Sequence, residues 1–185
     1  KGKNIVVTGY PTADNLLSKN STAVNFWKNS DKDCLRIIWA PHHSILANDT
    51  LHYSNFLELA DAMLDLANRY SDKVQFAFKP HPILKTKLYD LPEWGHQRTD
   101  EYYAKWNNGN NTILADGGYI DLFLTSDALI HDSSTFMAEY LYTHKPLMFI
   151  VKENYEMSGG LFLTTSNELK LLNSNEISLT SSTSS

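Results

Sequence analysis

The stretch SDALIHDSSTFMAEYLYTHKP, residues 126–146, decides the fold class, because its hydrophobic residues change period along its length. Residues 128–130 form a short, continuous apolar run, which is typical of a strand buried in a parallel sheet. Residues 134–143 have the spacing of an amphipathic helix. Four polar residues lie around the junction: Asp132, Ser133, Ser134 and Thr135. The stretch therefore predicts one strand–helix unit of an α/β domain.

The same alternation recurs along the chain. Further apolar runs occupy residues 4–8, 35–39, 74–78, 112–114 and 147–151. Helical patterns occupy residues 54–70, 102–106 and 119–126. Strands that alternate with helices, joined by right-handed crossovers, predict a doubly wound α/β domain with a mostly parallel sheet. At residues 79–99, where prolines interrupt the pattern, we expect a surface loop with short helical turns.

Composition excludes several classes of protein. The chain has 185 residues, of which 42% are hydrophobic and 20% charged, as in an ordinary globular domain. Its net charge of −5 argues against a nucleic-acid binder that relies on a broad basic face. Cys34 is the single cysteine, which excludes an internal disulfide and favours a reduced compartment. No apolar run has the length of a membrane span.

The chain opens on Lys1, and its first methionine is Met63. We therefore expect it to be a piece of a longer protein, with part of the active site elsewhere. Residues 1–175 are expected to form the α/β domain, and residues 176–185 a Ser/Thr-rich tail outside the core.

Unusual residues gather where the predicted strands end, and ligands bind beyond the carboxyl ends of the strands in an open α/β sheet. These segments contain Gly9 and Pro11; Pro41, His42 and His43; Lys79, His81 and Pro82; Gly117 and Gly118; and Asp132, Ser133, Ser134 and Thr135. We expect these residues around one ligand site, apart from Gly117 and Gly118, which we interpret as a plain turn.

Lys79 and His81 are the strongest candidates for contact with phosphate. Pro80 and Pro82 fix the backbone on both sides of His81. A lysine and a protonated histidine held in this way can neutralise phosphate charge. The Asp-Ser-Ser-Thr run has two interpretations, because it can cap the next helix or bind an anion at the helix N-terminus. Glu139, one turn into that helix, is a candidate acceptor for ribose hydroxyls.

Other kinds of site fit the sequence less well. No two histidines have the i, i+4 spacing of a zinc helix, and the side chains of the adjacent His42 and His43 are expected to diverge, so we predict no metal site. The sequence has no G-x-S-x-G elbow of a Ser-His-Asp hydrolase. It also has no G-x-G-x-x-G dinucleotide fingerprint after its first strand.

Four segments, in order, resemble the C-terminal half of the CDP-glycerol glycerophosphotransferase family: VVTGYPTADNLL, IIWAPHHS, FKPHP and SDALIHDSSTFMAEYLYTHKP. That family comprises teichoic-acid and capsule-polymer transferases of the two-domain GT-B architecture. The resemblance implies a Rossmann-like domain that binds a CDP-linked donor, with no metal or other cofactor.

The resemblance also implies roles for single residues. Lys79, His81 and Pro82 match the family's K-x-H-P element near the donor pyrophosphate, which implies that Lys79 and His81 are catalytic. Further donor contacts are expected from Gly9, Pro11, Pro41, His42, His43, Asp132, Ser133, Ser134 and Thr135, and from Glu139 at the ribose. Thr12 replaces the family's usual arginine, and His144 stands where glycine is common, so a left-handed backbone there would be strained.

The implied function is transfer of a glycerol-phosphate or related polyol-phosphate unit from the donor to a cell-wall or capsule polymer. The implied partners are the donor, the polymer acceptor and a missing N-terminal acceptor domain, at the inner face of the bacterial cell membrane. Two alternatives remain open. One is a GT-B glycosyltransferase or sugar-nucleotide epimerase domain, and the other is a non-catalytic nucleotide-binding module.

Overall fold

The computed structural model describes residues 4, 6, 9–17, 23–28 and 33–151, and the backbone of residues 172–173. The predicted strand at residues 4–8 falls mostly outside the described residues, and the predicted tail at residues 176–185 lies outside them entirely. The proposed domain limit at residue 175 therefore stays a prediction.

The described residues form a parallel sheet, as predicted. Its strands are β1 (Leu35–Ala40), β2 (Val74–Phe78), β3 (Thr112–Leu114), β4 (Ala128–His131), β5 (Leu147–Val151) and β6 (Leu172–Asn173). They lie in the order β3-β2-β1-β4-β5-β6, and every neighbouring pair is parallel. The predicted strands from residue 35 onward are confirmed to within one residue at each end. This strand order is that of a doubly wound, Rossmann-like domain.

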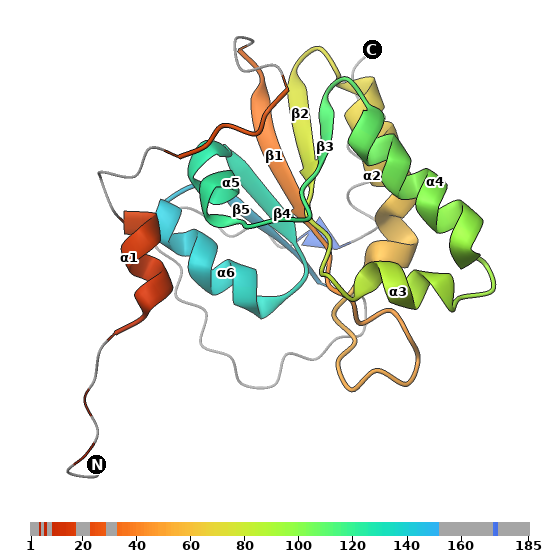
Figure 1. Ribbon diagram of the computed structural model, residues 1–185, viewed down its shortest axis with the longest axis horizontal. Coiled ribbons are helices and arrows are strands. Elements are labelled where there is room, and N and C mark those ends of the chain that lie inside the picture. The colour runs from red at the N-terminus through yellow and green to blue at the C-terminus, as the bar shows by residue number, and fades with distance from the viewer. Residues whose placement is uncertain are drawn as a thin grey trace.

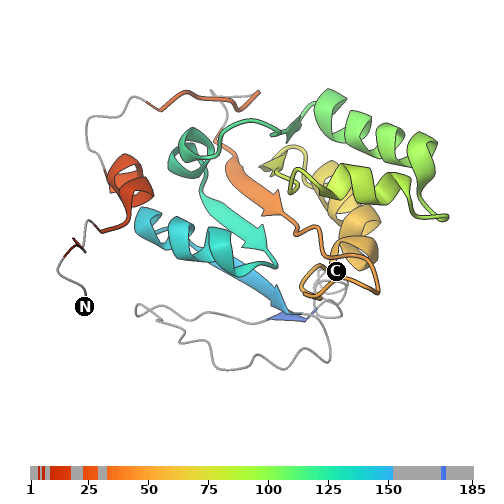
Figure 2. The ribbon, with the colours of Figure 1, turned by 60° about the horizontal axis from the view of Figure 1, so that its bottom comes forward.

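Helices cover both faces of the sheet. They are α1 (Pro11–Leu17), α2 (Phe56–Arg69), α3 (Leu84–Tyr89), α4 (Gly95–Asn108), α5 (Ile120–Thr125), α6 (Ser134–Tyr140) and the 3-10 helix η1 (Leu141–Thr143). Figures 1 and 2 show α2, α3 and α4 on one side of the sheet and α1, α5 and α6 on the other. The sequence missed α1, and it predicted only the C-terminal half of α4, whose first turns are mostly polar.

The alternation of side chains along the strands divides the core into two layers. Trp39, Phe76 and Phe78 face α2 and α4, where the ring of Trp39 stacks on that of Phe78 at 5.0 Å between centroids. Their strand neighbours Ile38 and Ala77 belong to the second layer, against α5 and α6. Because both faces are buried, ligands can reach the sheet only at its ends.

The short helix η1 ends in a left-handed residue, His144, with φ 57° and ψ 24°. A side chain with a Cβ atom is strained in this region of backbone space. His144 therefore adopts the left-handed helix end that the sequence analysis identified as strained for a residue other than glycine.

The position of the site follows from the topology of the sheet, because the connections after two neighbouring strands cross on opposite faces. From β1 the chain crosses through α2 on one face, and from β4 it crosses through α6 on the other face, although β1 and β4 are neighbours. The loops after these two strands diverge, and a crevice opens between them at the carboxyl edge of the sheet.

Candidate functional site

A pocket of about 370 Å³ occupies this crevice. Its lining comes from the loops after β1, β2 and β3 and from the junction of β4 with α6: Ala40, Pro41, His42, Lys79, Pro80, His81, Pro82, Asp116, Gly117, Tyr119, Ser133, Thr135 and Phe136. The structure therefore brings seven of the predicted site residues to one cavity: Pro41, His42, Lys79, His81, Pro82, Ser133 and Thr135. The predicted residues Gly9, Pro11, His43, Asp132, Ser134 and Glu139 are not part of the lining.

Lys79 supplies a buried positive charge to this pocket. Its side chain is 7% exposed, and Nζ donates a hydrogen bond of 2.6 Å to the carbonyl oxygen of Gly117. Burial lowers the pKa of Lys79, and the nearby Asp116 carboxylate partly reverses this effect. The loop is also fixed by its backbone, since the N–H of Lys79 donates to the oxygen of Trp39 at 2.8 Å. A buried ammonium group at the end of a strand is well placed to bind an anion.

The three histidines beside Lys79 converge, contrary to our expectation for His42 and His43. The ring centroids of His42 and His43 are 4.2 Å apart, and those of His43 and His81 are also 4.2 Å apart. The expectation of divergence was wrong because it assumed an extended backbone. After Pro41 the chain turns, and this turn places both adjacent rings against His81 from the β2 loop.

Burial keeps these imidazoles neutral at neutral pH. Burial and the neighbouring His43 and His81 lower the pKa of His42 to about 4. Burial, His43 and the charges of Lys87 and Lys79 lower the pKa of His81. The neutral form of His81 is therefore favoured in this pocket, and the expected protonation of His81 beside a bound phosphate stays a prediction.

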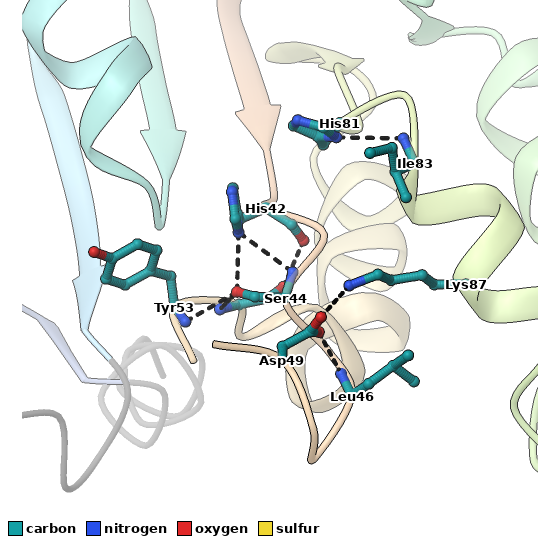
Figure 3. Close-up of polar contacts among 9 residues, drawn as sticks. His42, Ser44, Leu46, Asp49, Tyr53, His81, Ile83 and Lys87 are labelled. Carbon is teal, nitrogen blue, oxygen red and sulfur yellow. Dashed lines mark hydrogen bonds and ion pairs between the residues drawn. The ribbon is translucent and has the colours of Figure 1, made fainter. Parts of the chain in front are cut away.

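The hydrogen bonds of His81 and His42 indicate which ring nitrogen faces a ligand (Figure 3). The backbone N–H of Ile83 donates to Nδ1 of His81 at 3.3 Å, so Nε2 carries the proton of the neutral ring. Nδ1 of His42 is bonded to Oγ of Ser44 at 2.9 Å. A neutral His81 can therefore still donate a hydrogen bond through Nε2.

The Asp132 carboxylate connects two of the segments beside the pocket through hydrogen bonds. Its carboxylate is 4% exposed and accepts the backbone N–H of His42 at 2.7 Å and that of Asn55 at 2.8 Å. Burial raises the pKa of Asp132 to about 7, although these two N–H donors act in the opposite direction. The carboxylate thus ties the β1 loop and the start of α2 to the end of β4.

The hydroxyl residues after β4 do not act as a side-chain cap. Ser133 is the N-cap residue of α6, and no side-chain hydrogen bond caps the helix. Ser133 and Thr135 line the pocket, whereas Ser134 is exposed and lies outside the lining. The arrangement favours the ligand-binding interpretation of Ser133 and Thr135 over the capping one.

Glu139 is buried at 5% exposure behind the pocket wall. One carboxylate oxygen, Oε1, accepts a hydrogen bond from the hydroxyl of Tyr10, and the other, Oε2, has no partner among the described residues.

Gly9, with φ 81°, adopts the left-handed conformation that glycine tolerates, and Pro11 begins α1. These two residues thus border Tyr10, which covers Glu139.

The lining also contains functional side chains that were not among the predicted site residues. Asp116, Tyr119 and Phe136 line the pocket from the loop after β3 and the first turn of α6. Asp116 and Tyr119 flank the Gly117-Gly118 turn. This turn was the sequence signal that the loop after β3 lies at the carboxyl edge of the sheet. Burial, followed by the contact with Glu139, raises the pKa of the Tyr119 hydroxyl to about 12.

The fold and the pocket define a Rossmann-like α/β domain with a polar, hydrogen-bonding crevice at its switch point, where Lys79 lies. The chain belongs to the CDP-Glycerol:Poly(glycerophosphate) glycerophosphotransferase family, whose model matches residues 1–169. This confirms the family resemblance that the sequence motifs indicated.

Solved structures give weaker likenesses. The wall teichoic acid polymerase TagF is 21% identical, with a TM-score of 0.42, over 78% of this chain and 32% of that one. A second TagF structure is 22% identical, with a TM-score of 0.33, over 64% of this chain and 23% of that one. UDP-GlcNAc 2-epimerase from Neisseria meningitidis is 18% identical, with a TM-score of 0.36, over 64% of this chain and 27% of that one. The chain thus spans less than a third of each structure. No curated protein matches it.

Among the described residues, no helix has both the length and the apolar character needed to cross a membrane.

Proposed function

We propose that this chain is the donor-binding domain of a transferase that moves glycerol phosphate, or a related polyol phosphate, from a CDP-linked donor to a cell-wall or capsule polymer. Family membership supports the reaction type. The observation that carries the proposal is the pocket at the switch point, where Lys79, His81 and the start of α6 surround one cavity.

The proposed reaction is a displacement at phosphorus. An acceptor hydroxyl attacks the β-phosphorus, the bond between this atom and the bridging oxygen breaks, and CMP leaves with that oxygen. Negative charge develops on the leaving phosphate. Lys79 supplies a positive charge, and neutral His81 supplies an N–H donor, so both stabilise the transition state electrostatically without a metal cofactor.

The proposal assigns the remaining groups as follows. Ser133 and Thr135 donate to the donor phosphates, and Pro41, His42 and Pro82 shape the cavity around them. Glu139 accepts from the ribose once Tyr10 moves aside. The acceptor, and the base that takes the proton of its hydroxyl, belong to a further N-terminal domain, and the complete enzyme works at the inner face of the cell membrane.

The first prediction concerns the choice of nucleotide. We expect CDP to bind to this chain more tightly than UDP, GDP or ADP in calorimetric titrations. A chain that prefers UDP would instead be a nucleotide-sugar domain, and a folded chain that binds no nucleotide would contradict the proposed function.

The second prediction separates phosphate binding from helix capping. We expect Ser133→Ala and Thr135→Ala to weaken CDP binding, each by about fivefold to tenfold for one lost hydrogen bond to a charged group. CMP binding should change less, because CMP lacks the second phosphate.

The matched control is Ser134→Ala, since Ser134 is exposed and outside the pocket lining. We expect it to bind CDP as the unmodified chain does. If Ser133→Ala and Thr135→Ala lowered the melting temperature by the loss of a cap, about 1 kcal/mol, and left CDP affinity unchanged, the capping interpretation would be correct.

A further inference from the structure

The three imidazoles at the mouth of the pocket form a group that the transfer reaction does not explain. Only His81 is needed as a donor to phosphate, yet His42 and His43 pack against it from another loop. The potential ligand atoms of His42, His43 and His81 all lie within 4.8 Å of one another. In the part of the chain that the structure describes, no other group of histidine, cysteine and carboxylate side chains converges in this way.

We propose that His42, His43 and His81 bind a divalent transition-metal ion, such as Zn²⁺, with a coordination position open toward the pocket. The site requires only this chain and does not depend on the proposed transfer. Three imidazoles and one open position form a known arrangement for Zn²⁺, and imidazole also suits Ni²⁺ and Cu²⁺. Hard cations such as Mg²⁺ prefer oxygen ligands and should bind weakly here.

The geometry needs only a small adjustment. Zn²⁺ binds imidazole nitrogen at about 2.0–2.1 Å, so ligand nitrogens around a tetrahedral ion lie about 3.4 Å apart. The ligand atoms of the three histidines lie within 4.8 Å of one another, so they are at most about 1.4 Å farther apart than around such an ion. Rotations of the rings can close this difference. The rings come from two loops that are fixed by Asp132 and by the prolines around His81, so the ligands are largely preorganised.

The hydrogen bonds of the rings are compatible with metal binding. Nδ1 of His42 accepts the backbone N–H of Ser44 at 3.3 Å and lies 2.9 Å from Oγ of the same residue. When Nδ1 carries the proton and donates to Oγ, the longer bond is lost and Nε2 has a free lone pair for the ion. Nδ1 of His43 is buried and has no hydrogen-bond partner among the described residues, so a ligand would satisfy it. The bond from the N–H of Ile83 to Nδ1 of His81 is long, at 3.3 Å, and its loss opposes binding only slightly.

Nearby carboxylates partly offset the positive charges around the cluster. Lys87 is ion-paired with Asp49 beside His43, and both influence the pKa of that ring. Lys79 lies near His81 and has Asp116 as its acidic neighbour. Lys87 and Lys79 both still lower the pKa of His81, so the two carboxylates reduce the repulsion that a cation meets but do not remove it. Since the ion and a phosphate both use His81, a bound ion should oppose donor binding through this ring.

The test is a titration of the 185-residue chain with Zn²⁺ by calorimetry, without nucleotide, and with Co²⁺ by visible absorption. We expect one ion per chain, and we expect His43→Ala to weaken binding by about tenfold or more, because a ligand is lost. His52→Ala and His96→Ala are the matched controls, since both side chains are exposed and lie outside the cluster. They should bind the ion as the unmodified chain does.

A second measurement does not depend on a folded variant. Added Ni²⁺ should broaden the imidazole NMR signals of His42, His43 and His81 more strongly than those of the other histidines of the unmodified chain. Absence of an equimolar Zn²⁺ site, unchanged affinity in a folded His43→Ala, or broadening centred on other histidines would each overturn the proposal. Because no nucleotide is present, these results are independent of whether the chain binds CDP.

Discussion

His81→Ala should lower the rate of transfer by about a hundredfold or more, which corresponds to about 3 kcal/mol of lost transition-state stabilisation. The imidazole lines the pocket, its Nδ1 is occupied by the N–H of Ile83, and Nε2–H is left as a donor. The bond to phosphate strengthens as charge develops on the leaving group, so the loss should appear mainly in kcat. The measurement is incorporation of labelled glycerol phosphate by a protein that contains this chain and the proposed acceptor domain.

His81→Gln tests the neutral form of the donor. Glutamine keeps an N–H donor but carries no charge, so this variant should retain an intermediate activity if a neutral His81 is sufficient. If His81→Gln were as inactive as His81→Ala, a protonated imidazole would be required. The control is His96→Ala, whose ring is exposed and stacks on Tyr89 away from the pocket. Activity within a factor of a few of the unmodified protein in His81→Ala would rule out the catalytic role.

Asp132→Ala should lower the free energy of unfolding by about 3 kcal/mol, because two buried N–H groups lose their acceptor at once. These are the backbone donors of His42 and Asn55, which the carboxylate joins across the carboxyl edge of the sheet. Such a loss corresponds to a decrease in melting temperature of about 10 °C for a chain of this size. The measurement is urea-induced unfolding at pH 8, where the carboxylate is ionised.

Asp132→Asn and Asp65→Ala are the matched comparisons. Asparagine keeps one acceptor oxygen and turns an NH₂ group toward the second donor, so its loss should be smaller than that of alanine but still measurable. Asp65 is exposed on α2, so its replacement should change the unfolding free energy by less than about 0.5 kcal/mol. If Asp132→Ala were no less stable than Asp65→Ala, the carboxylate would not hold the loops together.

Much of the fold followed from local patterns. The run at residues 74–78 is mostly apolar because β2 lies inside the sheet and is buried on both faces, and its limits were predicted without error. The first turns of α4, by contrast, contain Gly95, His96, Gln97 and Arg98, whose polarity concealed a helix that buries Tyr102 and Trp106 further along. Helix α1 was missed because it is short and begins directly at Pro11.

The sequence by itself determined which segments meet at the ligand-binding edge. Strand runs that alternate with helices indicate a parallel sheet, and a parallel sheet brings the carboxyl ends of its strands to one edge. This predicts Lys79, His81, Ser133 and Thr135 around one site, and all four line the same pocket. These inferences succeeded because periodicity and chain direction are local properties.

Only the tertiary structure decided how the side chains of the site are arranged and how burial affects their charge. The convergence of His42 and His43 on His81, the neutrality of their rings and the burial of Asp132 and Glu139 all depend on contacts between distant parts of the chain. Side-chain direction in a loop is set by the turn and its neighbours, and a pKa is set by burial and nearby charge. Neither quantity is encoded in the spacing of residues along the sequence, so the packing of the His42 and His43 rings against His81 was established only in the folded domain.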